Sequence, residues 1–343
     1  MIQRRQFFGS LAALATLPTF TPSLFAASRE ETLPWKCDVI QTIPHGKGNR
    51  TPVVTGVSLQ KGGDLVAIVG DDHHIGIYDS AQSKFIHDLA AHTDWIRTAK
   101  FSPNGRILAT AGNDRKLKIW NVETFGDPQQ FQHQDAIIDI AFTSDSKRLA
   151  TVGFNRELAI YDLNRHRFEK RLRCECPDNH AVAFSQDDTL IAAGGRSGVI
   201  RVWQTDSGRQ LNQIKLHRQR IRSIEFTQDK QLISCGDDQV VKITDLKTEN
   251  SRTLPRHSAK LFSMVILNKT LMATAGSDNK IHIWRIADGQ EMGTLKGHTG
   301  TVSCLDFSAN KLASGSFDTH VRLWTMDEQD PLGRQTRLFR DQR

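Results

Sequence analysis

Short runs in which apolar and polar residues alternate recur along most of the chain, separated by clusters of turn residues. Within residues 92–121, one run ends at Pro103-Asn104-Gly105, a second ends before Asn113-Asp114, and a third ends at Trp120-Asn121. Alternation with a period of two is typical of half-buried β-strands, and the Pro-Asn-Gly cluster is typical of a tight bend between them. This stretch therefore predicts three consecutive short strands.

The strand pattern repeats at a fixed spacing. The position of the aromatic residue that closes an alternating run recurs every 40 to 42 residues, at Tyr78, Trp120, Tyr161, Trp203, Thr244, Trp284 and Trp324. A period of about 40–45 residues with four short strands per unit is the signature of propeller blades. We therefore predict an all-β fold in which seven blades, each of four antiparallel strands, occupy residues 35–326.

Polar residues recur inside the units as well. The last unit contains Gly297-His298, Ser314, Asp318 and Trp324, and this pattern resembles the WD40-repeat β-propeller family over about residues 35–326. The resemblance implies a buried network in which the indole N–H donates to the hydroxyl, the hydroxyl meets the imidazole, and the aspartate holds the imidazole. Such a network favours one geometry only when it is complete, because unpaired buried polar groups cost free energy. Three units are expected to hold the complete set: His92/Thr110/Asp114/Trp120, His257/Thr274/Asp278/Trp284 and His298/Ser314/Asp318/Trp324.

The remaining units depart from this pattern. The fifth keeps His217, Ser234 and Asp238 but has Thr244 at the tryptophan position, and the first, third and fourth keep fewer of the four residues. Histidine, serine and aspartate also form the catalytic triad of serine hydrolases. Because the set recurs in several units here, whereas a triad occurs once, we interpret it as structural and predict no catalytic residue.

The ring must be closed by one end of the chain. Six outer strands lie between successive units, and an open ring would leave unpaired strand edges. Residues 37–43 precede His45 as residues 210–214 precede His217, so the N-terminal segment is expected to form the outer strand of the last blade. Residues 335–339, within a C-terminal tail of residues 327–343, are the alternative.

Residues 1–28 are excluded from the predicted fold. A basic start is followed by an apolar stretch and by Ala26-Ala27-Ser28, which is the layout of a secretory signal. Arg4-Arg5-Gln6-Phe7-Phe8-Gly9 also resembles the twin-arginine signal of bacterial export. We expect a bacterial protein of the periplasm or cell envelope, with no transmembrane span in the mature chain. Removal of both arginines would lower the formal charge from +7 to +5, and an uncleaved anchor is the alternative.

The composition excludes several function classes. Hydrophobic residues make up 38% and charged residues 24% of the chain, as in ordinary globular proteins. Basic residues are interspersed with acidic ones, so no nucleic-acid partner is expected. Five cysteines without a recurring spacing do not form a disulfide framework. The sequence has no Gly-rich phosphate loop, no His-Glu-x-x-His and no repeated inward acid, so neither a cofactor nor a metal is expected.

The resemblance implies that partners bind the face carrying the His loops and the Asp turns. The positions that the family exposes there hold Trp95, Phe154 and Phe317, and aromatic residues are enriched at interface hot spots. Equivalent positions on blades four to six hold a basic arc, defined as Arg196, Arg218, Arg220 and Lys260. The predicted partner-binding residues are Trp95, Asn113, Phe154, Arg196, Arg218, Arg220, Lys260 and Phe317.

These features favour a monomeric, non-enzymatic interaction module or scaffold with a protein or peptide partner. The basic arc favours an acidic protein segment or an anionic envelope component. The alternative is a propeller enzyme of the lactonase or hydrolase type with a metal in the central channel. That alternative requires several Asp, Glu, Asn or His side chains converging from different blades.

Overall fold

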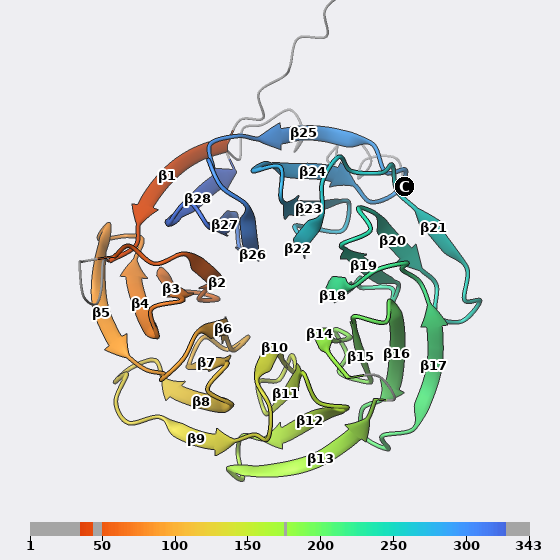
Figure 1. Ribbon diagram of the computed structural model, residues 1–343, viewed down its shortest axis with the longest axis horizontal. Coiled ribbons are helices and arrows are strands. Elements are labelled where there is room, and N and C mark those ends of the chain that lie inside the picture. The colour runs from red at the N-terminus through yellow and green to blue at the C-terminus, as the bar shows by residue number, and fades with distance from the viewer. Residues whose placement is uncertain (1–34, 44–49, 175–176, 327–343) are drawn as a thin grey trace, which may run out of the picture. The chain divides into compact units, whose positions relative to one another are not determined.

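The chain folds into a ring of seven β-sheets. The computed structural model describes residues 35–43, 50–174 and 177–326, which belong to one compact unit, Thr32–Arg343. Their regular structure comprises 28 strands in seven four-stranded antiparallel sheets, arranged as blades around a central channel (Figure 1). The predicted seven-bladed fold is confirmed. The predicted signal, residues 1–28, and the tail, residues 327–343, lie outside the described residues.

The first four blades run in chain order, with strands named from the channel outward. Blade one comprises β2 (Val54–Leu59), β3 (Leu65–Gly70), β4 (His74–Asp79) and β5 (Lys84–Ala90). Blade two comprises β6 (Ile96–Phe101), β7 (Ile107–Gly112), β8 (Lys116–Asn121) and β9 (Gln129–Gln132). Blade three comprises β10 (Ile137–Phe142), β11 (Arg148–Gly153), β12 (Glu157–Asp162) and β13 (Arg167–Arg173). Blade four comprises β14 (Asn179–Phe184), β15 (Leu190–Gly195), β16 (Val199–Gln204) and β17 (Gln210–Lys215).

The last three blades complete the ring. Blade five comprises β18 (Ile221–Phe226), β19 (Leu232–Gly236), β20 (Val241–Thr244) and β21 (Ser251–Thr253). Blade six comprises β22 (Leu261–Ile266), β23 (Leu271–Gly276), β24 (Ile281–Arg285) and β25 (Glu291–Leu295). Blade seven comprises β26 (Val302–Ser308), β27 (Lys311–Ser316), β28 (His320–Met326) and β1 (Trp35–Gln41).

The hydrophobic core lies between the blades. Ile77 of blade one and Trp120 of blade two share one cluster, and Val54 of blade one shares another with Val321 of blade seven. A single four-stranded sheet cannot bury its apolar faces alone, so each blade depends on both neighbours. This dependence fixes the order of the blades and holds their loops at one edge in register.

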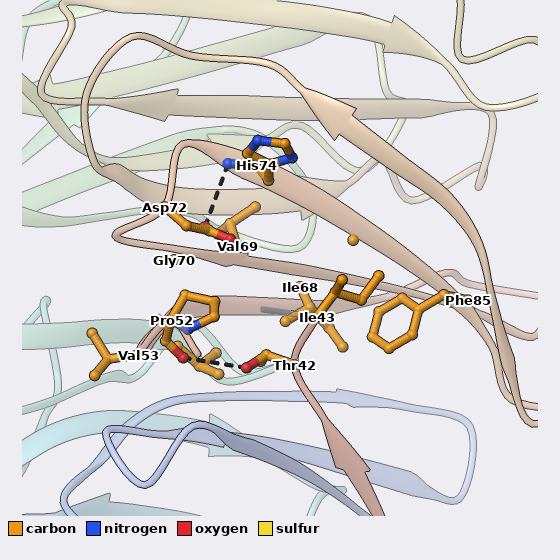
Figure 2. A pocket seen from close by; sticks show the side chains of 12 residues that line it. Thr42, Ile43, Pro52, Val53, Ile68, Val69, Gly70, Asp72, His74 and Phe85 are labelled. Atoms are coloured by element: carbon orange, nitrogen blue, oxygen red, sulfur yellow. Dashed lines mark hydrogen bonds between the residues drawn. The ribbon is translucent and has the colours of Figure 1, made fainter. Parts of the chain in front are cut away.

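The N-terminal strand closes the ring, as predicted. β1 pairs with β28 from Trp35 opposite Met326 to Gln41 opposite His320. Just beyond it, the Thr42 hydroxyl lies 3.0 Å from the Thr319 carbonyl oxygen and 3.3 Å from that of Pro52. A small pocket of about 20 Å³ lies beside this contact and joins the end of β1 to blade one (Figure 2). Residues 335–339, the alternative closing strand, lie outside the described residues.

Side chains tie the innermost strands of adjacent blades together. Asp306 of blade seven accepts a hydrogen bond from the Leu59 N–H of blade one at 2.7 Å. Asp139 of blade three accepts one from the Val182 N–H of blade four at 3.0 Å. These bonds satisfy backbone N–H groups on the edges of innermost strands, which no further strand covers. Among the described residues, no helix is long and apolar enough to cross a membrane.

Candidate interaction face

The buried network of blade two is complete. His92 Nδ1 lies 2.8 Å from Asp114 Oδ2, and His92 Nε2 lies 2.8 Å from the Thr110 hydroxyl oxygen. The Trp120 indole N–H donates to the same hydroxyl oxygen at 3.0 Å. His92 and Thr110 are both buried, so each bond replaces one that water would otherwise supply.

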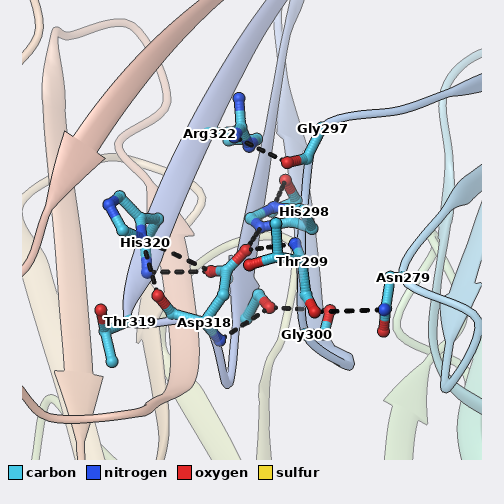
Figure 3. Close-up of polar contacts among 12 residues, drawn as sticks. Asn279, Gly297, His298, Thr299, Gly300, Asp318, Thr319, His320 and Arg322 are labelled. Atoms are coloured by element: carbon cyan, nitrogen blue, oxygen red, sulfur yellow. Dashed lines mark hydrogen bonds and ion pairs between the residues drawn. The ribbon is translucent and has the colours of Figure 1, made fainter.

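Blade seven repeats this arrangement. The equivalent distances are 2.8, 2.8 and 2.9 Å in the set His298, Asp318, Ser314 and Trp324. Figure 3 shows His298 and Asp318 of this set facing each other. Asp318 also accepts hydrogen bonds from the Thr299 and His320 backbone N–H groups. Although burial acts in the opposite direction, these bonds and the contact with His298 hold the pKa of Asp318 below its usual value. The ionised aspartate thus joins the His loop to the Asp turn.

Blade six differs from the predicted network. The Trp284 indole N–H donates to the Thr274 hydroxyl at 2.9 Å, as expected. Asp278, however, lies 2.8 Å from His282 Nε2 instead of bonding to His257, and the buried His257 Nε2 has no hydrogen-bond partner. The physical reason is competition: His282 stands directly opposite Thr274 in the sheet and reaches the same carboxylate. The prediction of a complete His257 network was wrong.

The incomplete blades use other partners. In blade five, His217 lies 2.9 Å from Asp238 and 2.8 Å from the Ser234 hydroxyl, without a tryptophan. In blade three, the Tyr161 hydroxyl lies 2.6 Å from His133 Nε2 and so bridges directly to the histidine. Burial raises the pKa of Tyr161 to about 12 and lowers that of His133 to about 4, so both groups are neutral at neutral pH.

The His loop and the Asp turn of a blade meet through one backbone hydrogen bond. In blade two, the Asn113 N–H donates to the Trp95 carbonyl at 2.9 Å, and in blade seven the Phe317 N–H donates to the Thr301 carbonyl at 3.0 Å. Gly112 precedes Asn113 because a Cβ atom there would lie only 2.1 Å from the Trp95 carbonyl oxygen. Glycines hold the equivalent position, with equally close approaches, in four further blades: Gly153, Gly195, Gly236 and Gly276. The loops and turns therefore form one continuous face.

Three of the predicted residues are exposed aromatics on this face. The exposed fraction is 42% for Trp95, 45% for Phe154 and 51% for Phe317. Phe154 and Phe317 also line the central channel, which has a volume of about 720 Å³. Phe154 of blade three and Phe317 of blade seven therefore both face the mouth of the channel.

The basic arc divides into two kinds of residue. Arg196, Arg218 and Lys260 are exposed and, in the part of the chain that is described, form no ion pair. Arg220 turns instead toward blade four, where its Nη2 lies 3.0 Å from Asp178 Oδ2. Its positive charge is therefore largely neutralised within the fold.

Sequence reasoning missed the residues at the start of the inner strands. Arg97 and Arg222 line the channel at its mouth, on blades two and five, and Phe262 of blade six lies beside Arg222. The signal was available, because the first channel-facing position of each inner strand follows the His loop at a constant distance. It was overlooked because the resemblance pointed to the loops and not to the strand beneath them.

The inner strands carry a charged cluster, defined as Lys100, Asp139, Glu225 and Asp306, of which the first three line the channel. The inward acids come from three different blades, which corrects the expectation of no repeated inward acid. Burial raises the pKa of Asp139 to about 6 and that of Glu225 to about 7, and the positive charge of Lys100 opposes both shifts. Within the described ranges, no three His, Cys, Asp or Glu side chains are grouped so that they could hold a metal ion. The four described cysteines, Cys37, Cys174, Cys235 and Cys304, are free thiols.

Comparison with known proteins agrees with this architecture. The family model for the IFT122 first beta-propeller matches residues 53–294, which is more than half of the chain, and the WD domain, G-beta repeat model matches residues 289–325. The chain belongs to the WD40-repeat β-propeller family.

Several members of this WD40 family are similar over most of the propeller. Apoptotic protease-activating factor 1 of Rattus norvegicus is 24% identical over 72% of this chain, which spans 20% of that protein. Eukaryotic translation initiation factor 3 subunit I of Aspergillus fumigatus is 26% identical over 79% of this chain and 91% of the relative. Periodic tryptophan protein 2 homolog of Caenorhabditis elegans is 23% identical over 67% of this chain and 26% of the relative. This chain therefore spans about a fifth of the first of these WD40 relatives.

The relatives do not support the expected bacterial origin, because those named above come from two animals and a fungus. The twin-arginine-like residues Arg4 and Arg5 lie outside the described residues. Export therefore remains a prediction from the sequence.

Proposed function

We propose that this WD40 propeller is a monomeric, non-enzymatic scaffold that binds a protein partner on the face of His loops and Asp turns. The observation that carries the proposal is the exposure of Trp95, Phe154 and Phe317 on one face, with the last two at the channel mouth. Aromatic side chains supply much of the binding energy of protein interfaces, and exposing them without a partner is unfavourable.

Variants of the aromatic residues test this proposal. Wild-type protein and a Trp95→Ala/Phe154→Ala/Phe317→Ala variant would be used to capture partners from the same extract. Phe168→Ala is the matched control, because Phe168 is 40% exposed but lies on outer strand β13. We expect the control to retain the proteins that the wild type captures and the triple variant to lose them. Equal capture by all three proteins would contradict the use of this face.

The alternative function is that of a propeller enzyme with a metal in the channel. The observation that favours it is the presence of Asp139, Glu225 and Asp306 on three inner strands, where all three interact electrostatically with Lys100. Carboxylates are hard ligands for Ca²⁺, but the positive charge of Lys100 opposes the binding of a cation beside the same carboxylates. Metal analysis of the purified protein separates the two functions: stoichiometric Ca²⁺ or Zn²⁺ supports the enzyme, and its absence supports the scaffold.

We also propose export through a twin-arginine pathway to the periplasm or cell envelope. The proposal rests on Arg4-Arg5 and on the small residues that end the apolar stretch. In a bacterial host with that pathway, Arg4→Lys/Arg5→Lys is expected to leave the protein in the cytoplasm. Mass spectrometry of the wild type is expected to show an N-terminus near Ala27 or Arg29. An intact Met1 on cytoplasmic wild-type protein would contradict export.

A further inference from the structure

The mouth of the channel carries two arginines that lie outside the predicted set of partner-binding residues. The first channel-facing residue of each inner strand is, from blade one to blade seven, Thr55, Arg97, Ile138, His180, Arg222, Phe262 and Ser303. The two arginines stand on blades two and five, which are not neighbours in the ring. They occupy equivalent places and can be compared directly.

The two arginines differ in the side chain that each contacts at the Asp turn of its blade. Arg222 pairs with Asp237, through Nε to Oδ1 at 2.8 Å and through Nη2 to Oδ2 at 3.2 Å. Arg97 meets Asn113 at the equivalent turn position, where its Nε donates to Oδ1 at 2.8 Å. An amide accepts the same hydrogen bond as a carboxylate but carries no charge. The positive charge of Arg97 is therefore held in place without being neutralised by its turn.

Arg97 is also held rigidly. Its guanidinium lies 5.1 Å from the centre of the Trp95 ring, as that of Arg222 lies 5.0 Å from the ring of Phe262. With Nε bound to Asn113, the two Nη nitrogens remain available for a planar, bidentate acceptor. A preorganised guanidinium loses little conformational entropy when it binds an anion.

The surroundings make an anion favourable at this place. Burial lowers the pKa of Arg97, and although nearby Asp94 raises it, the positive charge of Arg222 lowers it further. The charge of Arg222 therefore disfavours the cationic form of Arg97, and an anion bound to Arg97 would offset this effect. The carboxylates of the charged cluster would repel the same anion, so it is held at the mouth.

We propose that Arg97 and Arg222, with Trp95 and Phe262 behind them, form a subsite at the channel mouth that binds a carboxylate side chain of an acidic peptide. The inference rests on the proposed function, because it assigns a chemical class to the partner of that face. A peptide is favoured over a small anion because the exposed aromatic residues Phe154 and Phe317 line the same opening and would contact the residues on either side of the bound carboxylate.

Asn113 and Asp237 occupy equivalent turn positions, so one substitution is expected to weaken anion binding and the reverse substitution to strengthen it. The probe is a fluorescein-labelled hexaglutamate peptide, with hexaserine as the neutral control, and binding is followed by fluorescence anisotropy. Asn113→Asp places beside Arg97 the carboxylate that Arg222 already has, so we expect about tenfold weaker binding. Asp237→Asn removes the carboxylate from Arg222, so we expect binding to become several-fold tighter. Both changes are nearly isosteric, and thermal melts would show that both variants fold.

A matched control tests whether the loss of any exposed arginine weakens peptide binding. Arg171 lies over the Phe168 ring at 5.1 Å on an outer strand, so Arg171→Met removes a comparable arginine far from the channel. Arg97→Met is expected to weaken hexaglutamate binding at least as much as Asn113→Asp, and Arg171→Met to leave it unchanged. The proposal is overturned if hexaglutamate does not bind, or if Asn113→Asp and Asp237→Asn bind it as the wild type does. Partner capture that still depends on the three aromatics would then leave the proposed function standing.

Discussion

His282 Nε2 lies 2.8 Å from Asp278 Oδ2. In blades two and seven, the equivalent aspartate contacts the histidine of the His loop instead. His282 Nδ1 lies 2.6 Å from Glu291 Oε1, so the ring is held between two carboxylates. Burial acts against the charged form, but the bonds to Asp278 and Glu291 prevail and raise the pKa of His282. Blade six therefore favours protonation of a histidine at the position where blade two has Lys118.

The first prediction concerns the pH dependence of this blade. Because the folded pKa of His282 is raised, its stabilisation is present below the unfolded value of about 6.5 and is lost as pH rises through the folded value. Lysine at this position stays charged. We expect the free energy of unfolding of the wild type to fall, relative to His282→Lys, by on the order of 1 kcal/mol between about pH 6 and pH 8.5.

Chemical denaturation at several pH values measures this difference. His87→Lys on the outer strand β5 is the control, because His87 is exposed and its replacement should leave the pH profile unchanged. Parallel profiles for the wild type and His282→Lys would show that the histidine is not held as a cation.

The second prediction concerns the complete network of blade seven. Asp318→Ala leaves His298 Nδ1 and two backbone N–H groups without their acceptor, so we expect a loss of about 1–3 kcal/mol in the free energy of unfolding. Asp288→Ala, which removes an exposed partner of Arg285, is expected to have no measurable effect. Equal losses would mean that the network does not stabilise the blade.

The third prediction concerns the charged cluster of the channel. Asp139 and Glu225 bind their protons more firmly in the folded state than in the unfolded one, so ionising them opposes folding as pH rises toward 7. Lys100→Met removes the charge that offsets this effect. We expect a loss of roughly 2–4 kcal/mol at pH 8 and a smaller loss at pH 5.

Denaturation at the two pH values measures the loss. Lys61→Met, which removes another channel-lining lysine outside the charged cluster, is the control and is expected to have a smaller effect. An equal loss at both pH values for Lys100→Met would show that the carboxylates do not depend on this lysine.

The sequence predicted the ring because the repeat is carried by many positions at once. Seven aromatic or equivalent positions and the alternating strands agree on seven blades, and the segment before His45 fits the outer-strand register. The partner in a hydrogen bond cannot be predicted from the repeat in the same way, because small shifts in side-chain position decide which acceptor a donor reaches. Position alone assigned Asp278 to His257, because alignment to the repeat does not weigh a second histidine on the adjacent strand.

The candidate site was predicted in part for the same reason. Trp95, Phe154 and Phe317 occupy repeat positions whose exposure follows from the fold. Glu225, Asp306 and Lys100 share one repeat position, three residues after the first channel-facing residue of their strands, whereas Asp139 lies one residue after it. The repeat could have aligned the first three, but their electrostatic interaction required the closed ring. The contrast between Asn113 and Asp237 was visible in the sequence, but its meaning required the two arginines that those residues contact.

The central claim is that this face is a binding surface. The affinity of a captured partner for the Trp95→Ala variant is the measurement that tests this claim most directly. Trp95 is exposed, so its removal should leave the melting temperature close to that of the wild type. We expect binding to weaken by about 2 kcal/mol or more at both low and high salt, as for a desolvated aromatic anchor, with Phe168→Ala unchanged. A sharp fall in the melting temperature, with normal binding by the protein that remains folded, would contradict the claim.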